Sequence, residues 1–137
     1  MKAPIAVALD APSLDVAKQW AHATAPFVDT LKIGLETYLR DGADAIAMVK
    51  ETDARLFLDL KLHDIPNTVS SAVKSVSDLA PRFLTVHASG GAAMIAAAVA
   101  ASPEISITAV TILTSLNEED LINIGFKPGT NERAAQL

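Results

Sequence analysis

The sequence predicts an α/β fold in which helices cover a parallel β-sheet. Short runs rich in Val, Ile, Leu and Ala alternate along the chain with segments of helical periodicity. These runs are almost continuously apolar, which is typical of strands in a parallel sheet with both faces covered. The chain has 137 residues, of which 50% are hydrophobic and 20% charged, so we expect one domain spanning residues 1–137.

The apolar runs place five expected strands along the chain. They are residues 5–9, 30–34, 55–60, 82–88 and 106–113. Each run is followed by a turn or a helix signal, as in repeated strand–helix units.

Helices are expected between the strands. Ser13 can cap the first, whose apolar positions Val16, Trp20 and Ala23 recur at helical spacing. The remaining expected helices are residues 37–50 with Ile46 and Val49 on the inner face, a helix capped by Asn67 and running through Val76, the Ala-rich segment 92–101, a short helix in "NEEDLINIG", and a further helix start in "TNERAAQL".

Two architectures fit this alternation. One is a complete five-stranded doubly wound sheet, and the other is the first five βα units of an eight-stranded barrel, which needs roughly 250 residues. Length alone favours the doubly wound sheet. In both architectures, polar groups at the C-terminal ends of the strands are the functional candidates.

Charged side chains follow the expected strands at these ends. Asp10 ends the first strand, Lys32 lies near the end of the second, and Asp59 and Lys61 end the third. Residues two apart in a strand share a face, so Asp59 and Lys61 point the same way, and Asp64 follows after the chain has turned. A cluster of alternating sign tolerates burial better than a lone charge, and two flanking carboxylates keep an ammonium protonated. The pattern predicts Lys61 as a positioned acid beside a fixed carboxylate.

Each of these residues also has a structural interpretation. Asp10 could cap the next helix, Lys32 could be an exposed edge lysine, and Asp64 could start a turn. His63 is one residue out of phase with Asp59 and Lys61 and is expected to face outward. His87, which ends the fourth strand, could line the site or be a hydrogen-bonded structural histidine. The charged residues taken as a set favour a functional site over these separate explanations.

Composition excludes several classes of function. The net charge of −5 and the lack of a basic patch argue against nucleic acid or an anionic membrane as partners. The absence of cysteine excludes disulfides, thiolate metal sites and a cysteine nucleophile, and it fits a reducing cytoplasm. The longest apolar stretch, residues 92–101, is far shorter than the roughly 20 residues that span a bilayer. We therefore expect a cytoplasmic protein.

The stretch "LFLDLKLHDIPNTV", residues 56–69, resembles the signature of the orotidine 5'-phosphate decarboxylase family. Its core, Asp-x-Lys-x-x-Asp, is shared with related sugar-phosphate lyases, but the Ile-Pro-Asn-Thr continuation with Lys32 upstream is more specific. The stretches "VALD", "LKIG", "VHASGG" and "AVTILTSL" are similar to that family too, so the resemblance runs from Val7 to about Leu137.

The resemblance implies a (β/α)8 TIM barrel of which about the first five βα units are present, as the N-terminal portion of the enzyme. It also implies a homodimer, with neither a metal nor an organic cofactor, that decarboxylates orotidine 5'-phosphate to uridine 5'-phosphate in pyrimidine biosynthesis. The family's phosphate grip lies in the later strands, and Lys127 and Arg133 are poorly placed substitutes for it.

Roles for individual residues are likewise implied by the resemblance. The charged tetrad would be Lys32, Asp59, Lys61 and Asp64. Within it, Lys61 would protonate C6 of the pyrimidine as carbon dioxide leaves, and Asp59 would sit beside the substrate carboxylate. Asp10 and Lys32 would bind ribose hydroxyls, and Ser115 would contact the pyrimidine. The residues that would reach the partner subunit's active site are Asp64, Ile65 and Thr68.

Two other functions remain open on the sequence. A magnesium-dependent sugar-phosphate decarboxylase or aldolase shares the barrel, although Lys32 and the Ile-Pro-Asn-Thr run argue against it. A receiver domain phosphorylated on Asp59 has a similar length, and Lys127-Pro128 resembles its lysine-proline pair. Asp10 has no second acid beside it, and Lys61 would have no role in such a domain.

Overall fold

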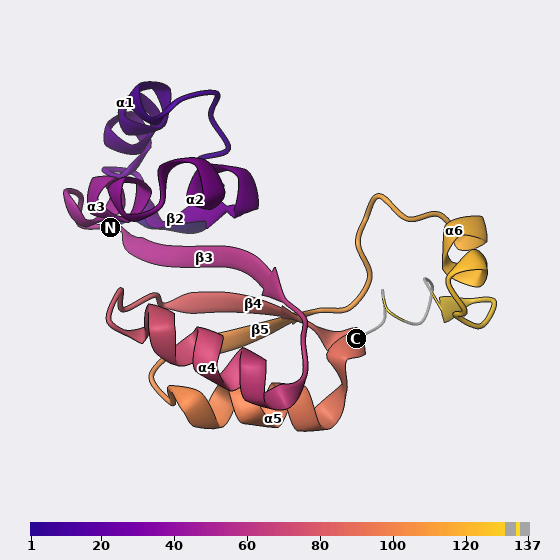
Figure 1. The fold of residues 1–137 in the computed structure, drawn as a ribbon. Coiled ribbons are helices and arrows are strands. Elements are labelled where there is room, and N and C mark those ends of the chain that lie inside the picture. Colours follow the sequence, from indigo (N-terminus) through magenta and orange to yellow (C-terminus); the bar gives the residue numbers. More distant parts are fainter. Residues whose placement is uncertain (131–133, 135–137) are drawn as a thin grey trace.

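The computed structural model describes residues 1–130 and residue 134. Its five strands are all parallel and pair in the order β1-β2-β3-β4-β5, which is the order of the chain (Figure 1). Their bounds are Ala3–Ala8 for β1, Val28–Gly34 for β2, Arg55–Leu62 for β3, Phe83–His87 for β4 and Ser106–Val110 for β5. A doubly wound sheet would reverse direction at an inner strand, whereas a barrel wall adds each strand beside the last. The sheet is therefore part of a (β/α)8 barrel, and the preference drawn from length was wrong.

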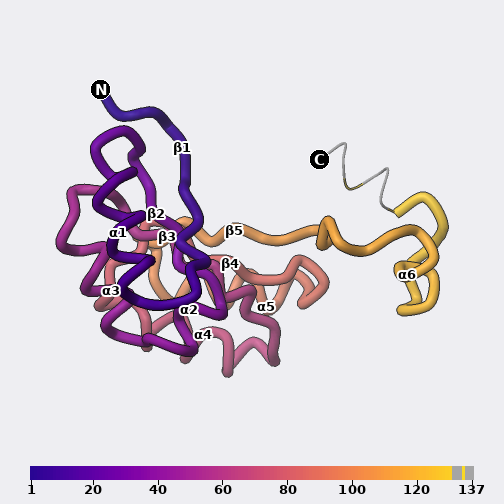
Figure 2. Tube along the Cα trace, turned by 90° about the horizontal axis from the view of Figure 1, so that it is seen from above, coloured from indigo at the N-terminus to yellow at the C-terminus, as the bar shows by residue number. Residues whose placement is uncertain are grey.

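Helices follow the strands and cover one side of the curled sheet (Figures 1 and 2). The bounds of these elements are Leu14–Thr24 for α1, Leu35–Asp41 for α2, Ala43–Lys50 for α3, Pro66–Ser77 for α4, Ala88–Gly90 for the 3₁₀-helix η1, Gly91–Ala101 for α5 and Glu118–Asn123 for α6. The segment after β5 leads away from the sheet, so α6 lies apart from the other helices (Figure 2). In the described part of the chain, no helix is both long and apolar enough to cross a membrane.

The core lies between the sheet and these helices. Alternate residues of the inner strands, such as Leu31, Leu58 and Leu84, are fully buried and belong to one cluster with residues of α1, α3, α4 and α5. The intervening residues face the concave side, where Phe57 and Phe83 meet edge to face with ring centroids 5.5 Å apart. Because strand residues alternate between faces, the same alternation carries the charged residues to the concave side.

The first helix begins where the sequence predicts but turns a different face inward. The side chain of Ser13 caps α1 and accepts a hydrogen bond from the Val16 amide at 3.3 Å. The buried residues are Ala17 and Ala21, whereas Trp20 is 43% exposed. Of the apolar positions that indicated this helix, Trp20 and Ala23 are thus exposed, because small alanines make the contact with the core.

The helix expected over residues 37–50 is two helices. Gly42 has φ of +51°, a left-handed conformation that favours glycine, and its amide donates to the Tyr38 carbonyl at 2.8 Å. This conformation ends α2, and α3 begins directly afterwards. Ile46 and Val49 are buried as predicted, so the break leaves the inner face intact.

The start of α4 also differs from the prediction. Ile65 is its N-cap residue, Pro66 is its first residue, and no side chain caps the helix, so Asn67 is not the cap. Proline suits this position because the missing N–H would have no partner inside the helix. The helix start expected in residues 130–137, including Arg133, lies largely outside the described residues.

Candidate active site

Four charged residues meet at the C-terminal ends of the first three strands. Asp10 follows β1, Lys32 lies in β2, and Asp59 and Lys61 lie in β3. The parallel register pairs Lys32 with Phe57 and Gly34 with Asp59, which brings these strand ends level. Parallel pairing thus gathers residues from separate parts of the sequence, as the sequence predicts.

Asp59 is the centre of this cluster. The Lys61 ammonium donates to Oδ1 of Asp59 at 2.9 Å, and the Lys32 ammonium donates to Oδ2 at 3.0 Å. The Asp59 side chain is only 13% exposed, against 20% for Lys32 and 29% for Lys61. Each carboxylate oxygen therefore holds one ammonium in a partly dry site, where ion pairs are screened less than at the surface.

Asp10 extends the cluster at its exposed end. Its Oδ2 lies 3.5 Å from the Lys32 ammonium, so the charges run Asp10, Lys32, Asp59, Lys61 with alternating sign. Gly34 makes room for Asp10, because a Cβ atom at this position would lie 2.6 Å from Oδ1 of Asp10. The interpretations of Asp10 as a helix cap and of Lys32 as a free edge lysine do not account for this arrangement.

The cluster keeps Asp59 ionised. Burial alone raises the pKa of the Asp59 carboxyl, but hydrogen bonds from Lys61, Lys32 and Thr85 outweigh burial and hold the pKa below its usual range. The cluster therefore presents an ammonium acid fixed beside an anion.

Thr85 belongs to this site, and the sequence analysis missed it. Its hydroxyl accepts a hydrogen bond from the Lys61 amide at 2.8 Å and donates one to Oδ1 of Asp59 at 2.9 Å. Thr85 is 3% exposed and lies in β4 between the fully buried Leu84 and Val86. A polar residue inside so apolar a strand is the one sequence signal that could have identified it.

Asp64 does not flank Lys61 in this chain, contrary to the expectation from spacing. Its Oδ1 accepts a hydrogen bond from the next amide, that of Ile65, at 2.6 Å, and it forms no ion pair within the described residues. Asp64 and Thr68 are exposed, and Ile65 is 66% exposed. Ser115 is also exposed, beyond the end of β5 at Val110, and among the described residues it makes no hydrogen bond with the charged cluster.

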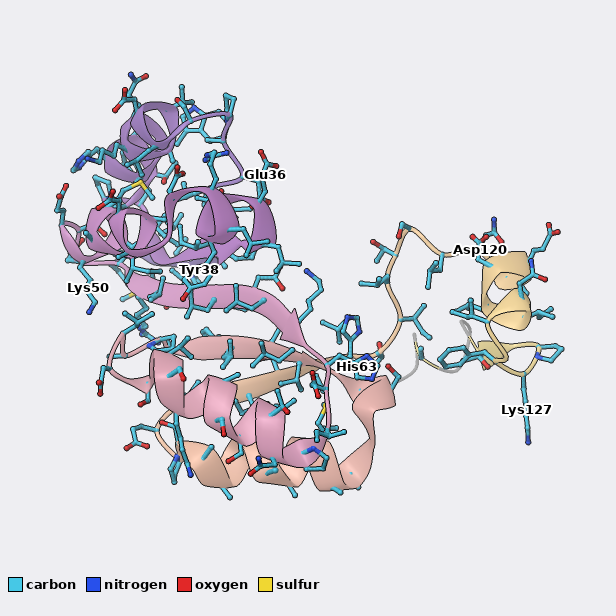
Figure 3. The ribbon with its side chains drawn as sticks, viewed as in Figure 1. Glu36, Tyr38, Lys50, His63, Asp120 and Lys127 are labelled. Carbon is cyan, nitrogen blue, oxygen red and sulfur yellow. The ribbon has the colours of Figure 1, made fainter. Side chains whose placement is uncertain are left out.

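Two histidines lie beside the cluster. The rings of His63 and His87 are 5.3 Å apart between centroids, and His63, which is exposed, directly follows β3 (Figure 3). Burial, then the charges of His63 and Lys61, lower the pKa of His87. Among the described residues, no three acidic or histidine side chains are grouped so as to hold a metal ion.

The sequence model of one protein family, described as "Orotidine 5'-phosphate decarboxylase / HUMPS family", matches residues 3–136. The chain belongs to this family. A relative from Thermobifida fusca named orotidine 5'-phosphate decarboxylase is 55% identical over 100% of the chain and 59% of its own length. The chain thus spans about three-fifths of that relative.

Solved structures agree with the decarboxylase family's barrel. Orotidine 5'-phosphate decarboxylase from Lactobacillus acidophilus matches with a TM-score of 0.73 and 35% identity, covering 88% of this chain and 58% of that one. An uncharacterised conserved protein from Geobacillus kaustophilus matches with a TM-score of 0.83 and 34% identity, covering 96% and 67% of the two chains. Membership of the orotidine 5'-phosphate decarboxylase/HUMPS family, together with the strand order, excludes the receiver-domain interpretation of Asp59.

Proposed function

We propose that this chain carries the site that decarboxylates orotidine 5'-phosphate to uridine 5'-phosphate in de novo pyrimidine biosynthesis. The observation that carries the proposal is the Lys61 ammonium, held 2.9 Å from a partly buried Asp59 at the strand ends of this family's barrel. Curated relatives named for this reaction support the choice of substrate.

The proposed chemistry needs one acid. As the bond between C6 and the carboxyl group breaks, carbon dioxide leaves and the bonding electron pair remains on C6. The Lys61 ammonium stabilises this carbanion and then gives it a proton, forming the new C6–H bond. The neutral amine of Lys61 regains a proton from solvent. The step proposed here uses neither a metal nor an organic cofactor.

The other charged residues would bind and orient the substrate. Asp59 would lie beside the substrate carboxylate while it holds Lys61 in place. Asp10 and Lys32 would bind ribose hydroxyls, for which their partial exposure at the open end of the cluster is suitable. Ser115 would contact the pyrimidine, which requires the segment after β5 to approach the strand ends.

The proposal includes a homodimer in which Asp64, Ile65 and Thr68 reach the partner's active site. All three side chains are exposed, and Asp64 has no ion pair with the described residues of its own chain, so it is free to meet a group outside this chain. An exposed isoleucine at the start of α4 suits an interface, where apolar side chains become buried. We also place the protein in the cytoplasm, which its lack of cysteine supports.

The Asp-x-Lys-x-x-Asp core also fits the magnesium-dependent sugar-phosphate alternative, so the test must separate the two substrates. The 137-residue chain is assayed with orotidine 5'-phosphate and, separately, with a hexulose phosphate and magnesium, each with and without a chelator. Loss of orotidine 5'-phosphate that persists in the chelator supports the proposal. Turnover of the sugar phosphate alone, abolished by the chelator, would replace it with the magnesium-dependent alternative.

A further inference from the structure

Thr85 places a polar hydroxyl group in buried, apolar surroundings. It lies in the middle of β4, 3% exposed, between two fully buried aliphatic residues. A buried hydroxyl without partners is costly, so such groups are retained where they make specific hydrogen bonds. Both partners of this hydroxyl belong to the charged cluster of the proposed site.

The Thr85 hydroxyl links the Lys61 backbone amide to the Asp59 carboxylate. Threonine has one O–H proton, which Thr85 donates to Oδ1 of Asp59 at 2.9 Å, and a lone pair of the same oxygen accepts the Lys61 amide at 2.8 Å. Oδ1 of Asp59 is also the oxygen that binds the Lys61 ammonium, at 2.9 Å. The contacts therefore close a ring from the Lys61 backbone through Thr85 and Asp59 to the Lys61 side chain.

The ring of hydrogen bonds includes a backbone position of unusual conformation, that of Lys61. Lys61 has φ of +50°, one of two non-glycine residues with positive φ within the described chain, and long side chains rarely adopt this conformation. The pairing of β3 with β4 shifts register between Leu58 and Leu62, so the ladder is irregular where Lys61 lies. The Thr85 side chain supplies the acceptor for the Lys61 amide at this irregularity.

We infer that Thr85 is a positioning residue whose hydroxyl fixes the Asp59 carboxylate and the strained Lys61 backbone, and thereby aims the Lys61 ammonium at the reacting carbon. The inference rests on the proposed function for its effect on turnover. The effect on Asp59 and on the Lys61 amide can be measured without turnover.

The first test uses substitutions that separate the hydroxyl from the shape of the side chain. Thr85→Val removes the hydroxyl at nearly constant volume, Thr85→Ala removes it without crowding, and Thr85→Ser restores it. Thr108→Val is the matched control, because Thr108 pairs with Thr85 in the neighbouring strand and makes no side-chain hydrogen bond in the described structure.

Carbon-13 NMR of the Asp59 carboxyl and hydrogen exchange of the Lys61 amide are then measured on the 137-residue chain. Losing a donor to the carboxylate should raise the Asp59 pKa in Thr85→Val and Thr85→Ala, and the Lys61 amide should exchange faster in both. Thr85→Ser and Thr108→Val should resemble the unsubstituted chain. An unchanged Asp59 titration and Lys61 exchange rate in a folded Thr85→Val or Thr85→Ala chain would overturn the inference.

The second test measures turnover of orotidine 5'-phosphate by the same variants. Thr85→Val should lower kcat roughly 10- to 100-fold, the size expected for a hydrogen bond to a charged group, with a smaller change in KM. The acid limb of its pH profile should move to higher pH, and Thr85→Ser should recover most of kcat. If the unsubstituted chain converts the sugar phosphate and not orotidine 5'-phosphate, the proposed function fails while NMR still decides the role of Thr85. If Thr85→Val matches an active unsubstituted chain in kcat and pH profile, the positioning role fails and the function stands.

Discussion

The Lys61 ammonium lies 2.9 Å from Oδ1 of Asp59, two residues earlier in the same strand. Both side chains project from β3 toward the concave side of the sheet. The short backbone segment between them therefore fixes the position of the acid relative to its anionic partner. Asp59 also holds Lys32 from the next strand at 3.0 Å, which ties this local pair to the sheet. The arrangement depends on strand geometry more than on any loop, and it leads to the following predictions.

Replacing the proposed acid should remove turnover and leave the fold. Lys61→Ala should lower decarboxylation by at least about 10²- to 10⁴-fold, the usual contribution of a general acid. Lys74→Ala, at an exposed lysine of α4 that forms no ion pair in the described structure, is the matched control and should keep full activity. Turnover is measured by loss of substrate and folding by circular dichroism. Near-normal turnover by Lys61→Ala would contradict the assignment.

Removing the central carboxylate should destabilise the chain in a pH-dependent way. Asp59→Asn leaves two ammonium groups near each other without their shared anion, at a cost of about 2–4 kcal/mol near neutral pH. The folded-state pKa of Asp59 is below its usual value, so its stabilising effect is present above about pH 4 and is lost as pH falls through that lowered pKa. Urea unfolding across this range should show the difference between the two chains shrinking with acid. A constant difference down to the lowest pH would contradict the described ion pairs.

The close approach of Gly34 and Asp10 can be tested by a double-mutant cycle. Gly34→Ala should destabilise by about 1 kcal/mol or less, because its Cβ would meet Oδ1 of Asp10 at 2.6 Å and the half-exposed carboxylate must rotate away from Lys32. In an Asp10→Ala background the same substitution should cost much less, since the obstructing carboxylate is absent. Gly34 has ordinary negative φ, so backbone strain does not confuse the comparison. Equal costs in both backgrounds, measured by urea unfolding, would show that the contact with Asp10 is not what excludes a side chain.

Sequence reasoning located the charged cluster because parallel strands carry alternate residues to one face and one end. It could not foresee the break at Gly42, since glycine inside a helical pattern is also compatible with a continuous helix. It missed Thr85 because a lone threonine in a strand has no distinctive spacing, and its role depends on a register shift in β3. It placed Asp64 beside Lys61 by counting residues, whereas the turn directs the carboxylate to the Ile65 amide.

Subunit mixing tests the proposed role of Asp64 across a dimer. Asp64→Ala and Lys61→Ala chains should each be inactive alone. If Asp64 completes the partner's site, random mixing gives half mixed dimers with one intact site each, or about a quarter of the original activity. Mixing Lys61→Ala with Asp59→Ala is the control. Each change damages the site of the chain that carries it, so neither site of a mixed dimer is complete and no activity should return. If the first mixture recovers no activity, Asp64 does not complete the partner's active site.

The alternating signs of Asp10, Lys32, Asp59 and Lys61 have a consequence for how fast substrate arrives. Two positive and two negative charges held within a few ångströms of one another cancel at a distance, and the chain as a whole carries −5. The proposed substrate, a dianionic nucleotide, would therefore meet no attractive long-range field from this face and would interact with the lysines only at short range. The net charge of −5 repels such a dianion, so its association rate should rise slightly with added salt, in contrast to enzymes that steer charged substrates with an unbalanced patch of opposite sign.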